Sequence, residues 1–122
     1  MKVRLHHQYI RFRLEEVEVE QLCSGQPIST KIQLGVAAII FELALFEGPN
    51  PALTMHEGEI HVQIPRGWTT GWKESDTVGF EFEYQEAGTL PLVVVVEKDY
   101  PCAHTSEGKA VFGRPLKMPI RG

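Results

Sequence analysis

The sequence predicts an α+β domain with a mainly antiparallel, strongly curved sheet of about six to eight strands and two short helices. Three observations lead to this fold class. Apolar and polar residues alternate with a period of two in several short segments. The chain has 11 Gly and 8 Pro, enough for many turns between strands. Two further segments show the three- and four-residue spacing of apolar residues that is typical of a helix.

The length of 122 residues fits a single domain. A domain of this size buries about two thirds of the surface that its unfolded chain exposes, so a proper core is available. Periodicity fades after residue 100, and Pro101, Pro115 and Pro119 follow. We therefore expect one α+β domain over residues 1–100 and an extended C-terminal tail over 101–122 that packs on it or trails from it.

The first 23 residues predict a hairpin and a helix. Val3 and Leu5, then Ile10, Phe12 and Leu14, alternate on both sides of a short polar break. Residues 15–23 alternate like a strand but also place apolar residues at helical spacing. Acidic residues at the start and Gly25 near the end favour a short helix there.

Four strands are expected next, separated by turns. Residues 29–34 predict one strand and residues 36–46 a longer one, with Ile39, Phe41, Leu43 and Leu45 on one face, and Gly35 lies between them as a turn or bulge. The Gly- and Pro-containing sequence 47–51 then stops the second strand. Residues 52–56 and 59–64 flank the tight turn Glu57-Gly58.

The second predicted helix spans residues 65–75. Pro65 suits the first helical position, and Trp68 and Trp72 lie one turn apart on the same face. Gly67 and Gly71 each cost about 1 kcal/mol against Ala in a helix interior. Packing of the two indoles must therefore hold the segment, and we expect both to be largely buried.

Residues 76–102 predict the central hairpin. Phe80, Phe82 and Tyr84 alternate with glutamates, a glycine-containing turn follows, and the unbroken apolar run 92–96 forms the second strand. The run ends in Glu97-Lys98-Asp99-Tyr100-Pro101-Cys102, where charge and sulfur are concentrated.

Charge and cysteine content exclude several classes of function. A net charge of −4 without a Lys/Arg cluster argues against nucleic-acid binding. No apolar stretch reaches the roughly 18 residues of a membrane span, and no signal peptide is recognisable, so a cytoplasmic protein is expected. Cys23 and Cys102 are too few for a disulfide scaffold or zinc ribbon and are expected to be reduced. No cofactor or metal site is predicted.

Four motifs carry a resemblance to a known family. They are K-x-R-x…I-R-x-R-L with a following E-V-E-Q in residues 2–21, P-x-x-W-x-x-x-W at 65–72, D-x-V-G-F at 76–80 and V-E-K-D-Y-x-C at 96–102. Together they make the chain similar to a family of short bacterial proteins classed only as a domain of unknown function. The resemblance covers about the first hundred residues, supports helices at 15–23 and 65–75, and implies no activity.

The leading functional hypothesis is a non-enzymatic binding or interaction module that uses a charged sheet face. Arg11 and Arg13, with Lys2 and Arg4, lie on one face of the first hairpin, and arginine forks bind carboxylates and other anions in a bidentate manner. The alternative is that these arginines pair across the strands with Glu81, Glu83 or Glu97 and give a solvated, charge-balanced sheet face. No Gly-rich phosphate loop, nucleophile elbow or recognisable acid pair supports catalysis.

The rival hypothesis is a small enzyme or metal-dependent protein centred on Lys98, Asp99, Cys102 and His104. Cys102 would be a nucleophile or soft-metal ligand, His104 its base or co-ligand, and Lys98 would lower the thiol pKa. The alternative interpretation is structural: Lys98 and Asp99 are charges at the end of a strand, and Cys102 anchors the tail. It is favoured because a single C-x-H motif supplies two ligands, whereas a zinc site needs three or four.

The histidines, the aromatic residues and the strand edges each suggest a further, weaker hypothesis. His56 and His61 could share a metal across a hairpin, but exposed polar histidines are the better account. The aromatic content of a barrel-like sheet would allow a cavity for a small apolar ligand. An exposed edge strand could support a homodimer, since unpaired strand edges are templates for association.

Overall fold

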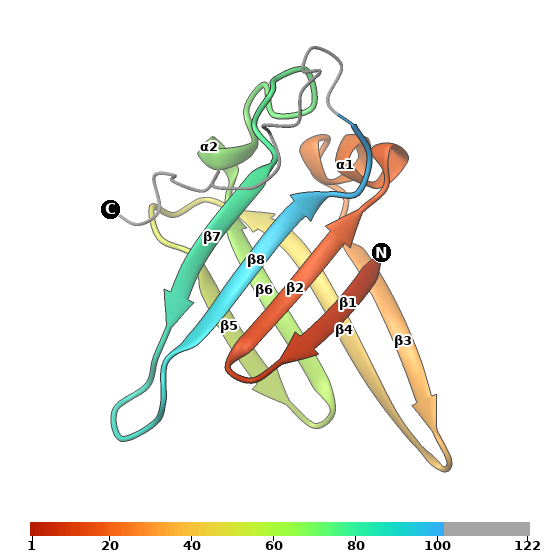
Figure 1. Ribbon diagram of the computed structural model, residues 1–122, viewed down its shortest axis with the longest axis vertical. Coiled ribbons are helices and arrows are strands. Elements are labelled where there is room, and N and C mark those ends of the chain that lie inside the picture. The colour runs from red at the N-terminus through yellow and green to blue at the C-terminus, as the bar shows by residue number, and fades with distance from the viewer. Residues whose placement is uncertain (102–122) are drawn as a thin grey trace.

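The computed structural model describes residues 1–101. This part of the chain is mostly sheet with two helices, and its elements follow one another as two similar series (Figure 1). The elements are β1 (Lys2–His6), β2 (Tyr9–Leu14), α1 (Glu16–Cys23), β3 (Ile28–Leu34), β4 (Ala37–Phe46), β5 (Ala52–His56), β6 (Glu59–Pro65), α2 (Arg66–Thr69), β7 (Gly79–Tyr84) and β8 (Leu92–Lys98).

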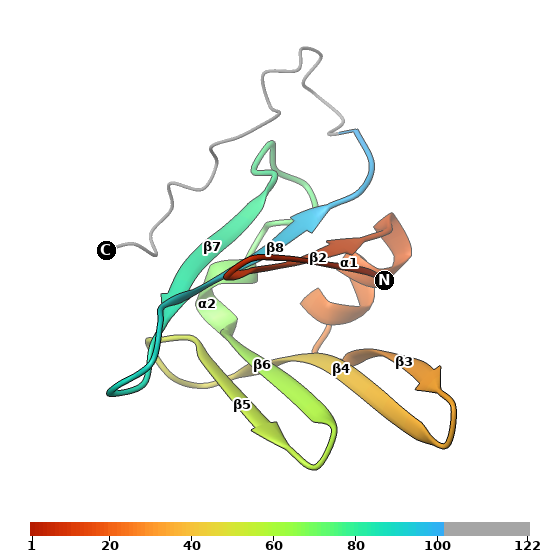
Figure 2. The ribbon, with the colours of Figure 1, turned by 60° about the horizontal axis from the view of Figure 1, so that its bottom comes forward.

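The strands form two four-stranded sheets rather than one curved sheet. Sheet A has the order β1-β2-β8-β7, and sheet B has the order β3-β4-β6-β5. Figure 2 shows the two sheets as separate layers, with α1 and α2 at the end where β2 and β6 finish. The predicted α+β class holds, but neither sheet closes on itself.

Each sheet is mixed, because its two central strands are parallel. β2 runs parallel to β8, and β4 runs parallel to β6, while the outer strands pair antiparallel through hairpins. The prediction of a mainly antiparallel sheet was therefore imprecise. Hairpins are encoded by local alternation, whereas each parallel pair joins strands that are distant in the chain or separated by a crossing connection.

The core lies between the two sheets. Phe12 of β2 is fully buried and meets Phe41 of β4 edge to face, with ring centroids 6.1 Å apart. Both helices close this core: Val19 and Leu22 of α1 are fully buried, and Trp72 just after α2 is only 2% exposed. Such an interior removes the inward-facing residues of all four central strands from water, which is the main favourable term in folding.

The two halves of the chain repeat the same plan. Residues 2–46 form hairpin, helix, hairpin, and so do residues 52–98. From β1 to the end of α1, adding fifty to a residue number gives the equivalent residue: the turns after His6 and His56 both hold a non-glycine residue at positive φ, His7 at 55° and Glu57 at 47°. Because each half gives one hairpin to each sheet, neither sheet belongs to one half alone.

The second helix is shorter than expected. It was predicted over 65–75, but α2 spans Arg66–Thr69, and turns continue to residue 75. The helix ends because Thr70 has extended backbone geometry with ψ 118°, and Gly71 then adopts a φ of +73°. Trp72 is buried as predicted and donates its Nε1–H to the carbonyl of Thr77 at 3.0 Å, whereas Trp68 is only partly buried.

A matched pair of glycines tests the packing of sheet A. A Cβ on Gly79 would lie 2.1 Å from the carbonyl oxygen of Val96, and relieving this clash would require the backbone to move. By contrast, nothing lies within 4 Å of a Cβ on Gly67 in α2. We expect Gly79→Ala to lower the free energy of unfolding by about 3 kcal/mol and Gly67→Ala to raise it by about 0.5–1 kcal/mol, as measured by urea unfolding. Equal effects of the two substitutions would contradict this account of β7 against β8.

Candidate functional site

The outer face of sheet A carries ordered rows of charge. Strand register places Lys2, Arg13 and Glu97 in one row across β1, β2 and β8. The next row runs across all four strands of the sheet and holds Arg4 of β1, Arg11 of β2, Val95 of β8 and Glu81 of β7. Because alternate residues of a strand point to opposite faces, this face is basic over β1 and β2 and acidic over β7.

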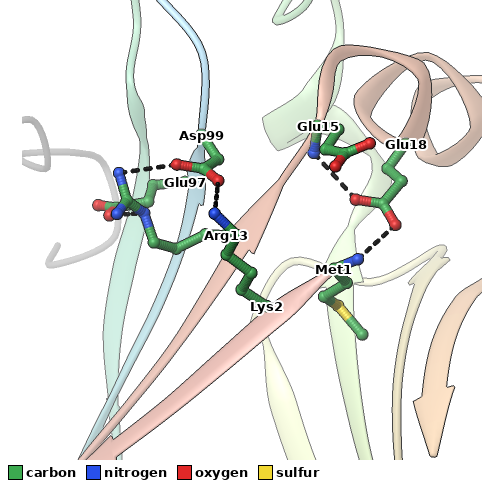
Figure 3. Close-up of polar contacts among 7 residues, drawn as sticks. All are labelled: Met1, Lys2, Arg13, Glu15, Glu18, Glu97 and Asp99. Atoms are coloured by element: carbon green, nitrogen blue, oxygen red, sulfur yellow. Dashed lines mark hydrogen bonds and ion pairs between the residues drawn. The ribbon is translucent and has the colours of Figure 1, made fainter.

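Arg13 lies between two carboxylates, that of Glu97 in β8 and that of Asp99 just after the strand. Its Nε lies 3.2 Å from Oε2 of Glu97, and its Nη2 lies 3.1 Å from Oδ1 of Asp99 (Figure 3). Lys2 reaches the second oxygen of Asp99 at 2.8 Å. Three strand ends are thus joined by charge-assisted contacts, and Arg13 is fixed in orientation.

The electrostatics of Asp99 follow from this arrangement. The hydrogen bond from Lys2 lowers the pKa of Asp99 below its ordinary value of 3.8; partial burial opposes this shift, and the charge of Arg13 adds to it. The carboxylate is therefore ionised at neutral pH, and it serves as a structural partner of the two basic residues.

The N-terminus is tied to α1 by a second set of contacts. The backbone N–H of Glu15 donates to Oε1 of Glu18 at 2.9 Å, and the other oxygen of Glu18 receives the Met1 ammonium group (Figure 3). Glu18 thus caps the helix start and anchors the beginning of β1 together. The basic strands β1 and β2 are held at one end by both sets of contacts.

Arg4 and Arg11 form a like-charged pair. They are direct cross-strand partners of β1 and β2, a placement that destabilises a sheet when both residues carry the same charge. Arg11 lies 3.7 Å from Glu97, a carboxylate already shared with Arg13, and its guanidinium lies 6.0 Å from the ring of Tyr9. Within residues 1–101, Arg4 has no ion-pair partner.

Lys98 and Asp99, adjacent in the sequence, lie on different sides of the sheet. Lys98 is 4% exposed, and its ammonium donates to the carbonyl of Ser75 at 2.8 Å, with the rings of Trp72 and Tyr100 each 5.8 Å away. This lysine holds the loop after α2 against the end of β8. The other two members of the predicted cluster, Cys102 and His104, lie outside the described residues.

A shallow groove of about 520 Å³ lies between the end of α1 and the segment around α2. Cys23, Thr69 and Lys73 are among its lining residues, and the Cys23 thiol lies 3.6 Å from the carbonyl oxygen of Thr69. Burial raises the pKa of Cys23 above its ordinary 9.0, so the group is a thiol at neutral pH. Sequence reasoning did not single out this groove, because its walls come from equivalent positions of two distant segments.

The described histidines lie at the end of β1, in the turn after it, and on β5 and β6 of sheet B. His56 is 80% exposed, whereas His61 lies between two carboxylates on the outer face of sheet B, with Nδ1 3.1 Å from Glu42 and Nε2 2.8 Å from Glu59. In the part of the chain that the structure describes, no group of three or more His, Cys, Asp or Glu side chains could hold a metal ion.

The pH dependence of stability tests the role of Asp99. Because its folded pKa is depressed, its contribution is fully present above the unfolded pKa of about 3.8 and is lost as pH falls through the lower folded value. Asp99→Asn should therefore lower the free energy of unfolding at pH 7 by up to about 1 kcal/mol, with a difference from the parent that shrinks below pH 4. Urea unfolding between pH 3 and 7 measures this.

The matched control is Glu57→Gln. Glu57 is 83% exposed, and its ion-pair contact among residues 1–101 is one with His56 at 3.7 Å. Its free energy of unfolding should follow the parent across the whole pH range. An Asp99→Asn curve that is parallel to the parent from pH 3 to 7 would show that this carboxylate does not stabilise the sheet in its charged form.

Comparison with known proteins places the chain in one family. No curated protein and no solved structure matches it. Among residues 1–101, no helix is long and apolar enough to cross a bilayer. The profile of a family of unknown function (DUF7009) matches residues 1–112. This match confirms the expected membership of a domain of unknown function and extends past residue 100. The chain therefore belongs to this family of unknown function.

Proposed function

We propose that the protein is a non-enzymatic binding module that recognises a carboxylate-bearing segment of a partner protein with the basic half of sheet A. We call this half the basic face and define it by Arg4, His6, Tyr9 and Arg11, with Arg13 at its border. The observation that carries the proposal is the Arg4–Arg11 pair, in which Arg11 has only a 3.7 Å contact with the shared Glu97 carboxylate and Arg4 has no ion-pair partner within residues 1–101. A like-charged cross-strand pair costs stability unless an anion is placed between the two groups.

The surrounding contacts favour this use of the face. Glu97 pairs with Arg13, and Asp99 pairs with both Arg13 and Lys2. These ion pairs connect β1, β2 and β8, and the guanidinium of Arg4 remains available to a ligand. Arginine presents a planar fork that matches a carboxylate, and arginine and tyrosine are enriched at protein interfaces. Tyr9, 39% exposed beside Arg11, supplies the apolar contact area that such an interface needs.

The chemistry of the site does not favour catalysis. The buried Lys98 ammonium, the paired Asp99 carboxylate and the Cys23 thiol are each engaged in local contacts. The Cys23 pKa is raised, whereas a nucleophilic cysteine requires a lowered one. We therefore place the function in recognition, with Arg4 and Arg11 as contact residues and Arg13 as a positioning residue.

Binding of a hexaglutamate peptide tests the proposal, measured by isothermal titration calorimetry at low salt. The double variant Arg4→Ala/Arg11→Ala should weaken binding by ten- to hundredfold, because each arginine contributes about 1 kcal/mol to the binding of an anion at an exposed site and about 1.4 kcal/mol is a factor of ten in affinity. The same variant should keep or slightly raise the free energy of unfolding, since it removes the like-charged pair.

Lys31→Ala is the matched control, because Lys31 is an exposed basic residue on a strand of the other sheet. Its affinity for the peptide should equal that of the parent. An equal loss in both variants would mean diffuse charge attraction, and an unchanged affinity in the double arginine variant would remove the basic face from the account. Tighter binding of a dT12 oligonucleotide than of the peptide would contradict a carboxylate-bearing partner.

A further inference from the structure

The hairpin of β3 and β4 has an apolar tip that no other described element covers. Its residues from Lys31 to Ala37 are all exposed, and they include Ile32 at 43%, Leu34 at 55% and Val36 fully exposed. Ile32 and Leu34 belong to the inward-facing series of sheet B, since Ile32 pairs with Ile39 and Leu34 with Ala37. In Figures 1 and 2 this hairpin projects beyond sheet A, which explains why its inner face lacks cover.

β3 is also an edge strand. Within residues 1–101 it pairs with β4 alone, so the backbone groups along its other side have no strand partner. Edge strands in native proteins are commonly blunted by charge or by short length. β3 has seven residues and one charged side chain, Lys31, whereas the edge strand β7 carries Glu81 and Glu83.

We propose that β3 is a self-association surface, which pairs antiparallel with β3 of a second copy about a two-fold axis at Ile32. The two B sheets would then form one continuous eight-stranded sheet. This inference concerns a different sheet from the basic face and does not rest on the proposed function. The basic face of each copy would stay free.

Self-complementarity is the reason for choosing a second copy as the occupant. In the register centred on Ile32, Lys31 of each copy faces Gln33 of the other, Thr30 faces Leu34, and the apolar side chains continue one another on the inner face. The same operation on the other edges is less favourable. On β1, centred on Arg4, it would oppose two arginines, and on β7, centred on Phe82, it would oppose Glu81 with Glu83.

β5 is the competing edge. It has five residues, against seven in β3, and a register centred on Thr54 would bring no like charges together. Its exposed apolar residue is Met55, at 67%. The shorter ladder and the single exposed apolar side chain make it the weaker interface, and the experiment below separates the two edges.

Sedimentation equilibrium over a wide concentration range measures association of the full chain. We expect a reversible dimer for the parent and at least a tenfold weaker dimer for Ile32→Lys, because two ammonium groups would meet at the axis. The control is Val17→Lys, which places the same side chain on α1 at a position that is already 56% exposed. It should dimerise like the parent. A parent that stays monomeric throughout, or an Ile32→Lys variant that dimerises equally well, would overturn the proposal.

Cysteine cross-linking tests the register independently of the lysine variant. In a background with Cys23→Ser and Cys102→Ser, Ile32→Cys should form a disulfide-linked dimer under mild oxidation, since directly opposed cross-strand Cβ atoms approach disulfide distance. Thr54→Cys on β5 should remain largely unlinked at the same concentration. Preferential linking through Thr54→Cys would assign the interface to β5 and overturn the assignment to β3.

Discussion

Parallel pairing at the centre of each sheet is the constraint on which the rest of this structure depends. β2 lies beside β8 and β4 lies beside β6, so each sheet contains one hairpin from each half of the chain. Sheet A is complete only when the hairpin of β7 and β8 pairs with the hairpin of β1 and β2. The two halves are therefore interlocked, and the core between the sheets forms from both at once: Phe12 and Val96 come from opposite ends of the described chain, yet they are direct partners and both are buried.

The same constraint positions the charged face. Because β2 and β8 run side by side, Arg13 comes to lie against Glu97 and Asp99, and these acids join the first strands to the last. Lys2 and the chain terminus complete this connection, the latter through Glu18 at the start of α1. These ion pairs lie at the end of β1 and β2 that holds Lys2 and Arg13, and the Arg4–Arg11 pair lies two residues further along both strands. The contacts that hold the strands together are thus separated from the proposed recognition residues along the same two strands.

Local patterns in the sequence predicted most of the elements. The alternation in residues 2–14 and 52–64 placed four strands, and the acidic start of residues 15–23 placed α1. The parallel pairs were missed because no local pattern encodes a neighbour many residues away. One signal was present: the unbroken run of residues 92–96 is typical of a strand buried on both faces, as parallel strands usually are, and Val94, Val95 and Val96 are all buried. The separation of Lys98 from Asp99 also follows from strand alternation, which the grouping of these residues by sequence proximity ignored.

Native-state amide hydrogen exchange tests the interlocked arrangement most directly. If neither sheet can persist without both halves, the most protected amides of β2 and β8 in sheet A and of β4 and β6 in sheet B should open with free energies that agree within about 1 kcal/mol and that equal the global free energy of unfolding. Exchange of the β4 and β6 amides at a clearly lower free energy, while β2 and β8 remain protected, would show that sheet B opens as an independent unit. That result would contradict the account.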